Sequence, residues 1–374
     1  MTLDDAYLPL HAWLTDTALP LWAERGLDRR DGGFFEKIDH AGNPTDDPRR
    51  TRLVARQIFS FAAAHEMGWA GPGLEIAAHG VDYLLDRCIA PDGLVHSVLA
   101  PDGTVLKGEF DTYDHAFALF SLATAASTGI RPQDCRNAAE VMLTRMKADY
   151  AHPEAGFFEG MPPGLLLLAN PHMHLFEAAL EWLEVTGEQS AWRTFAAELA
   201  GLALRRLVDP ESGAIRETWD LEWQAVPDGD RGHVIEPGHQ FEWAWLLLRW
   251  GRLSGNDAAI DAGKRLIEIG ERHGIDNEGL CFNAIDPGFA ATDTDRRLWP
   301  QTERIKANLA VGNETGAAEA LNGLARYFDT PVPGLWFETL RPDGTPVDEP
   351  ARGSSLYHIT CALREVARYR SRRP

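Results

Sequence analysis

The chain has few cysteines, and they are isolated from one another. Among 374 residues the four are Cys88, Cys135, Cys281 and Cys361, with no CxxC pair and no zinc-type spacing. Structural disulfides are therefore not expected, and the composition suits a reducing compartment.

The sequence also has no long apolar run, no recognisable signal peptide and few positive charges. No apolar stretch approaches the ~20 residues that a membrane-spanning helix needs, and the opening "MTLDDAYLPL" lacks the basic and apolar regions of a signal peptide. Against 56 Asp and Glu stand only 36 Lys and Arg, which gives a net charge of −20. Such a field repels nucleic-acid phosphates and anionic lipids. We therefore expect a cytoplasmic protein with neither nucleic acid nor membrane as a partner.

What the sequence does have is a six-fold repeat of turn motifs. A glycine followed by an apolar residue, usually just after an acid, recurs at gaps of 60, 63, 57, 66 and 55 residues. The copies lie at Gly33, Gly93, Gly156, Gly213, Gly279 and Gly334. Each opens a short alternating stretch, as in "DGGFFEKI" and "VPGLWFET", which indicates a small β-hairpin or irregular loop.

Between these turns the apolar residues have helical spacing, and β-branched residues are few. Stretches such as "RLVARQIFSFAAAHEMGW" and "QFEWAWLLLRWGRLSG" are each followed by a second one, which predicts twelve helices in six antiparallel hairpins. The last helix contains "LYHITCAL" and is as apolar as the middle ones, whereas an open solenoid needs polar end repeats. We therefore predict an all-α (α/α)6 barrel, with residues 1–374 as a single domain and the short hairpin loops at one mouth.

Polar and aromatic residues gather at the start of one helix in each pair. In a ring, these helix starts would all face the same rim of one cavity. A lone histidine among aromatic side chains is most often a satisfied core residue. Burying His and Glu repeatedly at the same stage of the repeat is costly without partners, so the pattern favours a shared polar pocket. The segments are "EFDTYDHAFAL", "LANPHMHLFEA", "EPGHQFEWAW", "RRLWPQTE" and "RGSSLYHITC".

In their order and spacing, "NPHMHLFEA", "EPGHQFEWAW", "RLWPQTE" and "YHI" resemble the N-acylglucosamine 2-epimerase superfamily. Within it, the resemblance is closest to the D-mannose isomerase and sulfoquinovose isomerase branch. It extends over essentially the whole chain, from "ARQIFSF" near residue 56 to "YHIT" at residue 358. The resemblance implies an enzyme that acts on a monosaccharide. We expect it to use neither a cofactor nor a metal, and a monomer or homodimer is the ordinary expectation for its assembly.

The resemblance also implies which residues form the site. His358 would be the principal proton shuttle, and His239 would assist ring opening and proton exchange. Glu242, three residues after His239 on the same helical face, would orient its imidazole. Some relatives carry a tryptophan where this chain has Arg52, so we expect the polar substituents of the substrate to differ. The sugar-binding residues would be Arg56, Tyr113, Asn170, His174, Arg231 and Trp299.

Aldose–ketose isomerisation needs groups that exchange protons near neutral pH, as histidine does. After ring opening, one histidine would move a proton between C2 and C1 through a cis-enediol. That step interconverts D-mannose and D-fructose, or D-lyxose and D-xylulose. Returning the proton to the opposite face would instead give a 2-epimerase of the mannose/glucose or N-acylglucosamine type, and the sequence leaves both outcomes open. An unphosphorylated aldose is favoured because no glycine-rich phosphate loop is present.

Two other chemistries compete with this interpretation. A metal site would draw on His172 and His174 of "HMH", but residues at i and i+2 point in divergent directions on a helix, and no carboxylate cluster is evident. A glycoside hydrolase on the same barrel would need two carboxylates that flank the bond. Glu109, Asp111 and Asp114 would supply them, but the histidines would then have no role.

Overall fold

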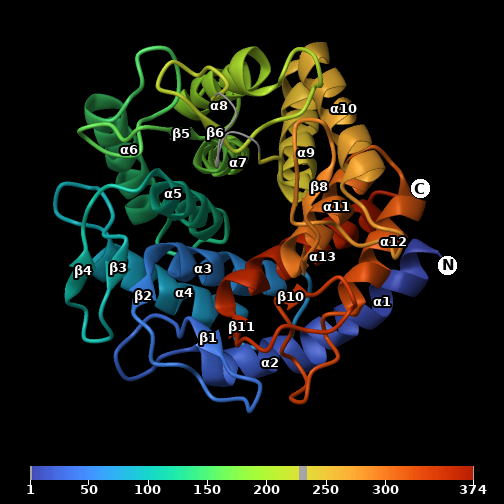
Figure 1. Cartoon of the computed structure of the whole chain (residues 1–374). Coiled ribbons are helices and arrows are strands. Elements are labelled where there is room, and N and C mark those ends of the chain that lie inside the picture. The colour runs from blue at the N-terminus through green and yellow to red at the C-terminus, as the bar shows by residue number, and fades with distance from the viewer. Residues whose placement is uncertain (1, 227–233, 374) are drawn as a thin grey trace.

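A computed structural model describes residues 2–226 and 234–373 of the chain. This part of the chain contains twelve continuous helices, as predicted, together with eleven short strands. Figure 1 shows the chain passing once around a ring, so that the blue N-terminal helix lies beside the red C-terminal one. None of the described helices is long and apolar enough to cross a membrane.

Six of the described helices lie on the inside of this ring. They are α3 (Thr51–Glu66), α5 (Thr112–Ser127), α7 (Ala169–Thr186), α9 (Pro237–Ser254), α11 (Leu298–Ala310) and α13 (Gly353–Ser371). Each contacts the next one along the chain, and α13 packs against α3, so the order of contacts returns to its start. Almost every residue of an inner helix such as α5 is buried, because inner and outer neighbours cover all of its faces.

The outer helices pair with the inner ones along the chain. These are α4 (Gly73–Tyr83), α6 (Pro132–Asp149), α8 (Ala191–Leu202), α10 (Asp257–His273) and α12 (Glu314–Ala325), which pack on α3, α5, α7, α9 and α11. Helix α1 (Leu3–Trp13) continues through η1 (Leu14–Ala18), α2 (Leu19–Leu21) and η2 (Trp22–Gly26), and packs on α12 and α13. Helices α4 and α8 end similarly in the π-helical turns η3 (Leu84–Cys88) and η4 (Ala203–Leu207).

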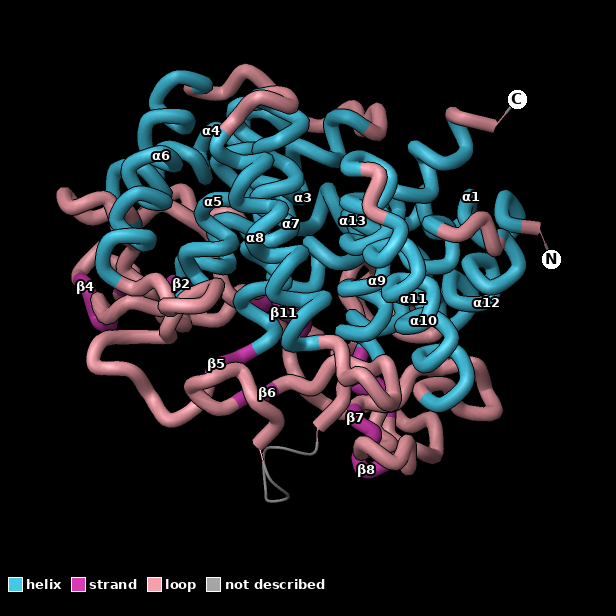
Figure 2. The backbone as a smooth tube through the Cα atoms, turned by 90° about the horizontal axis from the view of Figure 1, so that it is seen from above, coloured by secondary structure: helices cyan, strands magenta, loops and turns pink. Residues whose placement is uncertain are grey.

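The strands and the longer loops gather on one side of the ring, where the inner helices begin (Figure 2). All pairs are antiparallel. One strand of the first pair comes from the first loop and the other from the last loop, so this pair links the two ends of the ring on this side. The pairs are β1 (Lys37–Ile38) with β11 (Ala351–Arg352), β2 (Arg49–Arg50) with β3 (Val98–Leu99), β3 with β4 (Val105–Lys107), β5 (Leu167–Leu168) with β6 (Thr218–Trp219), β7 (Ala284–Ile285) with β8 (Ala291–Asp293), and β9 (Arg296–Arg297) with β10 (Thr339–Leu340).

The six repeat glycines form the turns that follow the outer helices. All have a positive φ, between 71° and 94°, a backbone region that glycine adopts without steric cost. Gly334 is further constrained, because a Cβ atom there would lie 2.7 Å from the backbone oxygen of Thr17. Gly279, with φ of 80°, faces open space instead.

Four inner helices carry, at their fourth position, a side chain that accepts a backbone N–H of the adjacent turn. The Nε2 atom of His172 accepts from the N–H of Phe157 at 2.9 Å, while Nδ1 donates to the carbonyl of Leu168 at 2.7 Å. Burial lowers the pKa of His172 to about 4, so it is a neutral structural histidine. The four residues are His115, His172, Gln240 and Gln301.

The repeat glycines offer a matched test of the turn geometry. We expect Gly279→Ala to lower the free energy of unfolding by about 1–2 kcal/mol, from the backbone conformation alone. Gly334→Ala should lower it by about 3–5 kcal/mol, because the new methyl group also meets the backbone of Thr17. Denaturant unfolding of both variants measures the difference, and equal losses would contradict the close approach at Gly334.

Candidate active site

The inner helices all begin on the loop side, so their first two turns surround one opening. Positions two and six of each helix lie on the same helical face, one turn apart. Position two is occupied by Arg52, Tyr113, Asn170, Gly238, Trp299 and Ser354. Position six is occupied by Arg56, Phe117, His174, Glu242, Glu303 and His358. The repeat therefore brings distant polar residues to one place.

A cavity of about 270 Å³ lies at this opening. Its size is close to the lower end of the ~300–1,000 Å³ typical of small-molecule sites. Arg231, which the sequence also assigns to the site, lies outside the described residues. The predicted site residues that line the cavity are Arg56, Tyr113, Asn170, His174, His239, Glu242, Trp299 and His358.

His239, on the first turn of α9, is held by a carboxylate from the preceding loop. Its Nδ1 atom lies 2.8 Å from Oε2 of Glu217, while Glu236 is 3.9 Å away. Burial alone would lower the pKa of His239, but Glu217 and Glu236 outweigh burial and raise the pKa to about 9. At neutral pH His239 is therefore an imidazolium that donates through Nδ1 and leaves Nε2–H for a molecule in the cavity.

The structure corrects the expected role of Glu242. We expected this residue to orient the imidazole of His239 from the next turn of the helix, but Glu217 makes that contact. Spacing along one helix favours an i, i+3 contact, whereas Glu217 reaches His239 from another part of the chain. Glu242 instead lies 3.9 Å from Nδ1 of His174 on α7.

His358, on α13, has the opposite protonation state. Its Nδ1 atom lies 3.0 Å from Oε1 of Glu303 on α11, so Nε2 is the nitrogen available to a molecule in the cavity. Burial lowers the pKa of His358 to about 4, against the opposing effect of Glu303. At neutral pH His358 is an uncharged imidazole, which is the form that accepts a proton.

The indole ring of Trp299 lies against both histidines. Its centroid is 4.8 Å from the ring centroid of His239 and 5.7 Å from that of His358. The two imidazoles therefore flank one aromatic surface within one cavity, although 118 positions separate them in the sequence. An acid and a base are both within reach of a small molecule that stacks on Trp299.

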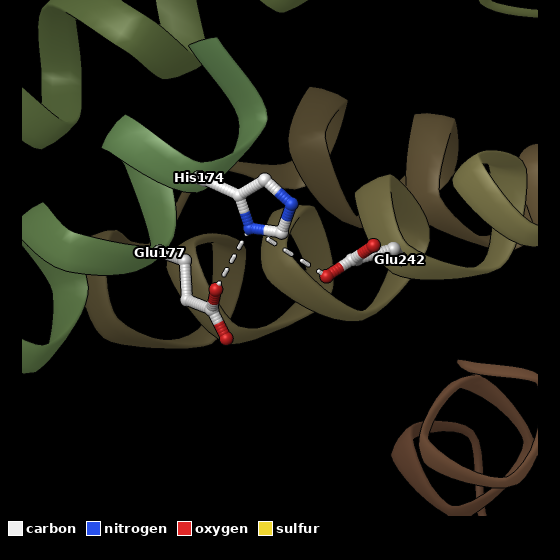
Figure 3. A group of neighbouring side chains, drawn as sticks. All are labelled: His174, Glu177 and Glu242. Atoms are coloured by element: carbon white, nitrogen blue, oxygen red, sulfur yellow. Dashed lines mark hydrogen bonds and ion pairs between the residues drawn. The ribbon is translucent and has the colours of Figure 1, made fainter. Parts of the chain in front are cut away.

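His174 and Glu177 of α7 and Glu242 of α9 form a buried cluster (Figure 3), and His174 and Glu242 also line the cavity. His174 contacts Glu177 through Nδ1 at 3.1 Å, and the Tyr357 hydroxyl donates to Glu177 at 2.7 Å. Both oxygens of Glu242 lack a hydrogen-bond partner among the described residues. Burial, reinforced by Glu303, raises the pKa of Glu242 well above its usual value.

This cluster is also one of two groups among the described residues that could hold a metal ion; the other is Glu217, Glu236 and His239. The ligand atoms of His174, Glu177 and Glu242 lie within 4.8 Å of one another, so the expectation that no carboxylates gather here was wrong. Two of the three groups already bind each other, and Tyr357 occupies Glu177 as well. An ion would have to displace these hydrogen bonds, so the donor set fits a proton network better than a metal centre.

Next to His174, the aromatic rings of Tyr113 and Phe117 hold a guanidinium group in place. Nη2 of Arg56 donates to the hydroxyl of Tyr113 at 2.6 Å, and its guanidinium lies 4.1 Å from the ring centroid of Phe117. Arg52 lies over Tyr113 at 4.9 Å and binds Asp114 through both Nε and Nη2 at 2.8 Å. Arg56 thus faces the cavity as a fixed positive charge.

The three acids that a glycoside hydrolase would use do not line the cavity. Asp114 is fully buried and bonded to Arg52, and Asp111 caps α5 by accepting the backbone N–H groups of Tyr113 and Asp114. Glu109 is exposed. None of the three acids that the sequence suggested for hydrolysis therefore lies at the cavity, which removes the observation on which the hydrolase interpretation rested.

Sequence reasoning missed Glu217 and Glu303, the partners of the two histidines. The repeat contains a signal for both. Glu217 lies at the same step after its turn glycine as Glu338, which accepts the N–H of Arg352 at the start of α13. Glu303 occupies position six of its helix, as the predicted site residues of other inner helices do.

Comparison with known proteins agrees with this geometry. A sequence model of the N-acylglucosamine 2-epimerase family matches residues 33–362. A "Mannose-6-phosphate isomerase" of Rhizobium meliloti is 43% identical, with 96% of this chain and 95% of that protein covered. A "D-mannose isomerase" of Thermobifida fusca is 27% identical, with 92% and 91% covered.

A crystal structure of D-mannose isomerase has the same fold. It superposes with a TM-score of 0.88 at 20% identity and covers 97% of this chain and 98% of that one. The two sequence relatives described above are named as sugar isomerases, and the match covers nearly the whole length of each. The chain therefore belongs to the N-acylglucosamine 2-epimerase family and is an enzyme of its sugar isomerase and epimerase class.

Proposed function

We propose that the protein is an aldose–ketose isomerase that interconverts D-mannose and D-fructose without a metal, on a single-domain (α/α)6 barrel. The observation that carries this proposal is the pair of imidazoles on Trp299, one protonated and one neutral, within one cavity. The closed ring of inner helices supports the barrel part of the proposal. D-lyxose fits the same reaction because it has the configuration of mannose at the reacting carbons.

The two histidines divide the proton transfers between them. His239 donates a proton to the ring oxygen as the bond between C1 and that oxygen breaks, and it takes back the proton of the anomeric hydroxyl, which leaves an aldehyde at C1; its ion pair with Glu217 favours the recharged imidazolium. Neutral His358 removes the proton from C2, and the electron pair forms the C1–C2 double bond of a cis-enediol while O1 gains a proton from His239. His358 then returns its proton to C1 while the O2 hydroxyl passes its proton back to His239 and the C2 carbonyl forms, which gives the ketose. Arg56 stabilises the negative charge that develops on the enediol oxygens.

A 2-epimerase is the alternative outcome of the same intermediate. It requires protonation of C2 on the face opposite to the base, and the imidazolium of His239 is the group that would deliver that proton. We favour isomerisation because only one of the two imidazoles, that of His358, is neutral in the free enzyme. A single base on one face of the sugar suffices to move a proton from C2 to C1.

Phosphorylated mannose is a second candidate substrate, because the 43% identical relative is named for it. Five arginines line the cavity, and Arg56 among them faces its interior. The other four each bind a carboxylate, so the rim is close to charge-balanced and suits a neutral sugar. The pairs are Arg50 with Glu36, Arg52 with Asp114, Arg297 with Glu236, and Arg352 with Glu349.

NMR of the substrate in D₂O tests the reaction and its substrate together. Chelator-treated enzyme should convert D-mannose to D-fructose and act on D-mannose 6-phosphate at least about tenfold less efficiently. Glucose as the product would identify an epimerase, and a preference for the phosphate would identify the second candidate. Loss of turnover on chelation, restored by a divalent ion, would contradict the metal-free mechanism.

Substitution of the proton shuttle has a matched control in this chain. His358→Ala should reduce kcat by about 10²–10⁴-fold or more, because the base is lost. His172→Gln should leave kcat unchanged, since glutamine makes the equivalent turn contact from Gln240 and Gln301. Steady-state assays of both variants, with circular dichroism to verify folding, test the assignment. Near-normal turnover in His358→Ala would refute it.

The different protonation states of the two imidazoles, one charged and one neutral, predict a bell-shaped pH profile of kcat/KM. Activity should fall below about pH 4, as His358 gains a proton and ceases to be a base. It should also fall above about pH 9, as His239 loses the proton that it donates. In Glu217→Gln the alkaline limb should move to lower pH, because the carboxylate that raises the pKa of His239 is gone. An unmoved alkaline limb would contradict this assignment.

A further inference from the structure

We propose that Lys306 is a positioning residue, whose ammonium group holds Glu303 as an anion and thereby fixes the orientation and tautomer of His358. The proposal deepens the function assigned above and rests on the role of His358 as the base. Lys306 does not line the cavity of the sugar site, so it acts through Glu303 rather than on the substrate.

One carboxylate joins Lys306 to the histidine. Nζ of Lys306 lies 2.5 Å from Oε2 of Glu303, which is one helical turn earlier on α11. The other oxygen of Glu303, Oε1, lies 3.0 Å from Nδ1 of His358. The side chains of Lys306 and Glu303 are both fully buried, so solvent does not screen their interaction.

Acidic groups surround the ammonium from several helices. Glu242 of α9 and Glu177 of α7 both stabilise the charged ammonium group. On α13, Cys361 lies beside the ammonium and Tyr357 interacts with the surrounding acids. The ring centroid of Trp245 lies 4.1 Å from Nζ. Cys361 Sγ is 3.8 Å away, but burial raises the pKa of this thiol to about 12, so it is uncharged. From α12, Glu319 faces Arg304 instead.

This arrangement distributes charge unequally between two buried carboxylates. Burial raises the pKa of both, but Lys306 and His358 outweigh it at Glu303, whose pKa falls to about 2. Glu242 has no such contact, and its pKa stays well above the usual value. Lys306 therefore stabilises the negative charge on Glu303, whereas Glu242, which faces the cavity, holds its proton more tightly than an ordinary carboxyl group.

The charge on Glu303 determines which nitrogen of His358 can act as the base. An ionised carboxylate only accepts hydrogen bonds, so Nδ1 of His358 must carry the hydrogen and Nε2 keeps its lone pair for the substrate. A protonated Glu303 could donate to Nδ1, which would favour the other tautomer. Arg56 also acts on His358, but it lowers the pKa of the ring and does not select a tautomer.

Substitutions at Lys306 test this role through the pH profile. In Lys306→Met we expect kcat at neutral pH to fall by about 10²-fold and the acid limb of kcat/KM to move to higher pH. The limb moves upward because Glu303 then titrates in the working range, and because a His358 freed from the ammonium holds its own proton more tightly. Lys306→Arg keeps a cation and should retain the wild-type acid limb. Lys264→Met, an exposed lysine on α10, should change neither quantity.

A double-mutant cycle shows whether Lys306 acts through Glu303. Glu303→Gln alone should reduce kcat, and adding Lys306→Met to it should cause no further loss, because the charge that the lysine holds is already gone. Multiplied losses in the double variant would overturn the proposal, as would a Lys306→Met enzyme that is folded and has an unmoved acid limb.

A readout without substrate separates this proposal from the proposed function. The ¹⁵N shifts of His358, assigned by comparison with His358→Ala, report which ring nitrogen carries the hydrogen. We expect hydrogen on Nδ1 in the wild type and a mixed or reversed tautomer in Lys306→Met, whether or not mannose is turned over. If neither D-mannose nor another aldose reacts, the proposed function fails, whereas an unchanged tautomer in Lys306→Met contradicts the positioning role.

Discussion

Each of the two imidazoles in the cavity is held by a carboxylate from another segment of the chain, and the protonation of the site depends on these two contacts. Both carboxylates bind Nδ1 and leave Nε2 for the substrate, yet the two histidines differ in charge. Two acids act on His239, whereas Glu303 is shared between His358 and a buried ammonium group. The same residue type thereby occurs as a cation at His239 and as a neutral imidazole at His358, both in contact with Trp299.

The helical repeat explains why these groups meet. Each inner helix begins on the loop side, and equivalent positions of successive helices point to the same centre. In α7, α9, α11 and α13, position six supplies an ionisable group, while the fourth position of several helices is used for the contact with the turn. Structural and chemical residues therefore alternate along one helix, as His172 and His174 illustrate within a single tripeptide.

Much of this organisation could be predicted from the sequence, because it depends on local pattern. The spacing of the glycines and the helical periodicity predicted the twelve helices, and the polar helix starts predicted that His239, His358 and Trp299 line a common cavity. The partners of the histidines could not be identified in the same way. Glu217 reaches His239 from a loop, and the contact of Glu303 with His358 joins two helices, so neither follows from spacing along one helix.

The expected contact between His239 and Glu242 failed for the same reason. Residues three apart on a helix are neighbours, but the fixed position of Glu217 decides which carboxylate the imidazole binds. Glu242 is left facing His174 and the cavity, where its burial and the neighbouring charge of Glu303 raise its pKa well above the usual value. Contacts between distant parts of the chain thus determine the pKa values in the site, and these contacts do not follow from the pattern of residues along one helix.

The central claim is that imidazoles from α9 and α13 act on one and the same monosaccharide. A crystal structure with D-mannitol, an unreactive open-chain analogue, tests it most directly. We predict that the alditol lies along Trp299, with Nε2 of His358 close to C1 and C2 and Nε2 of His239 within hydrogen-bond distance of one of its oxygens. An alditol that contacts only one of these two rings, or that binds outside this cavity, would contradict the account.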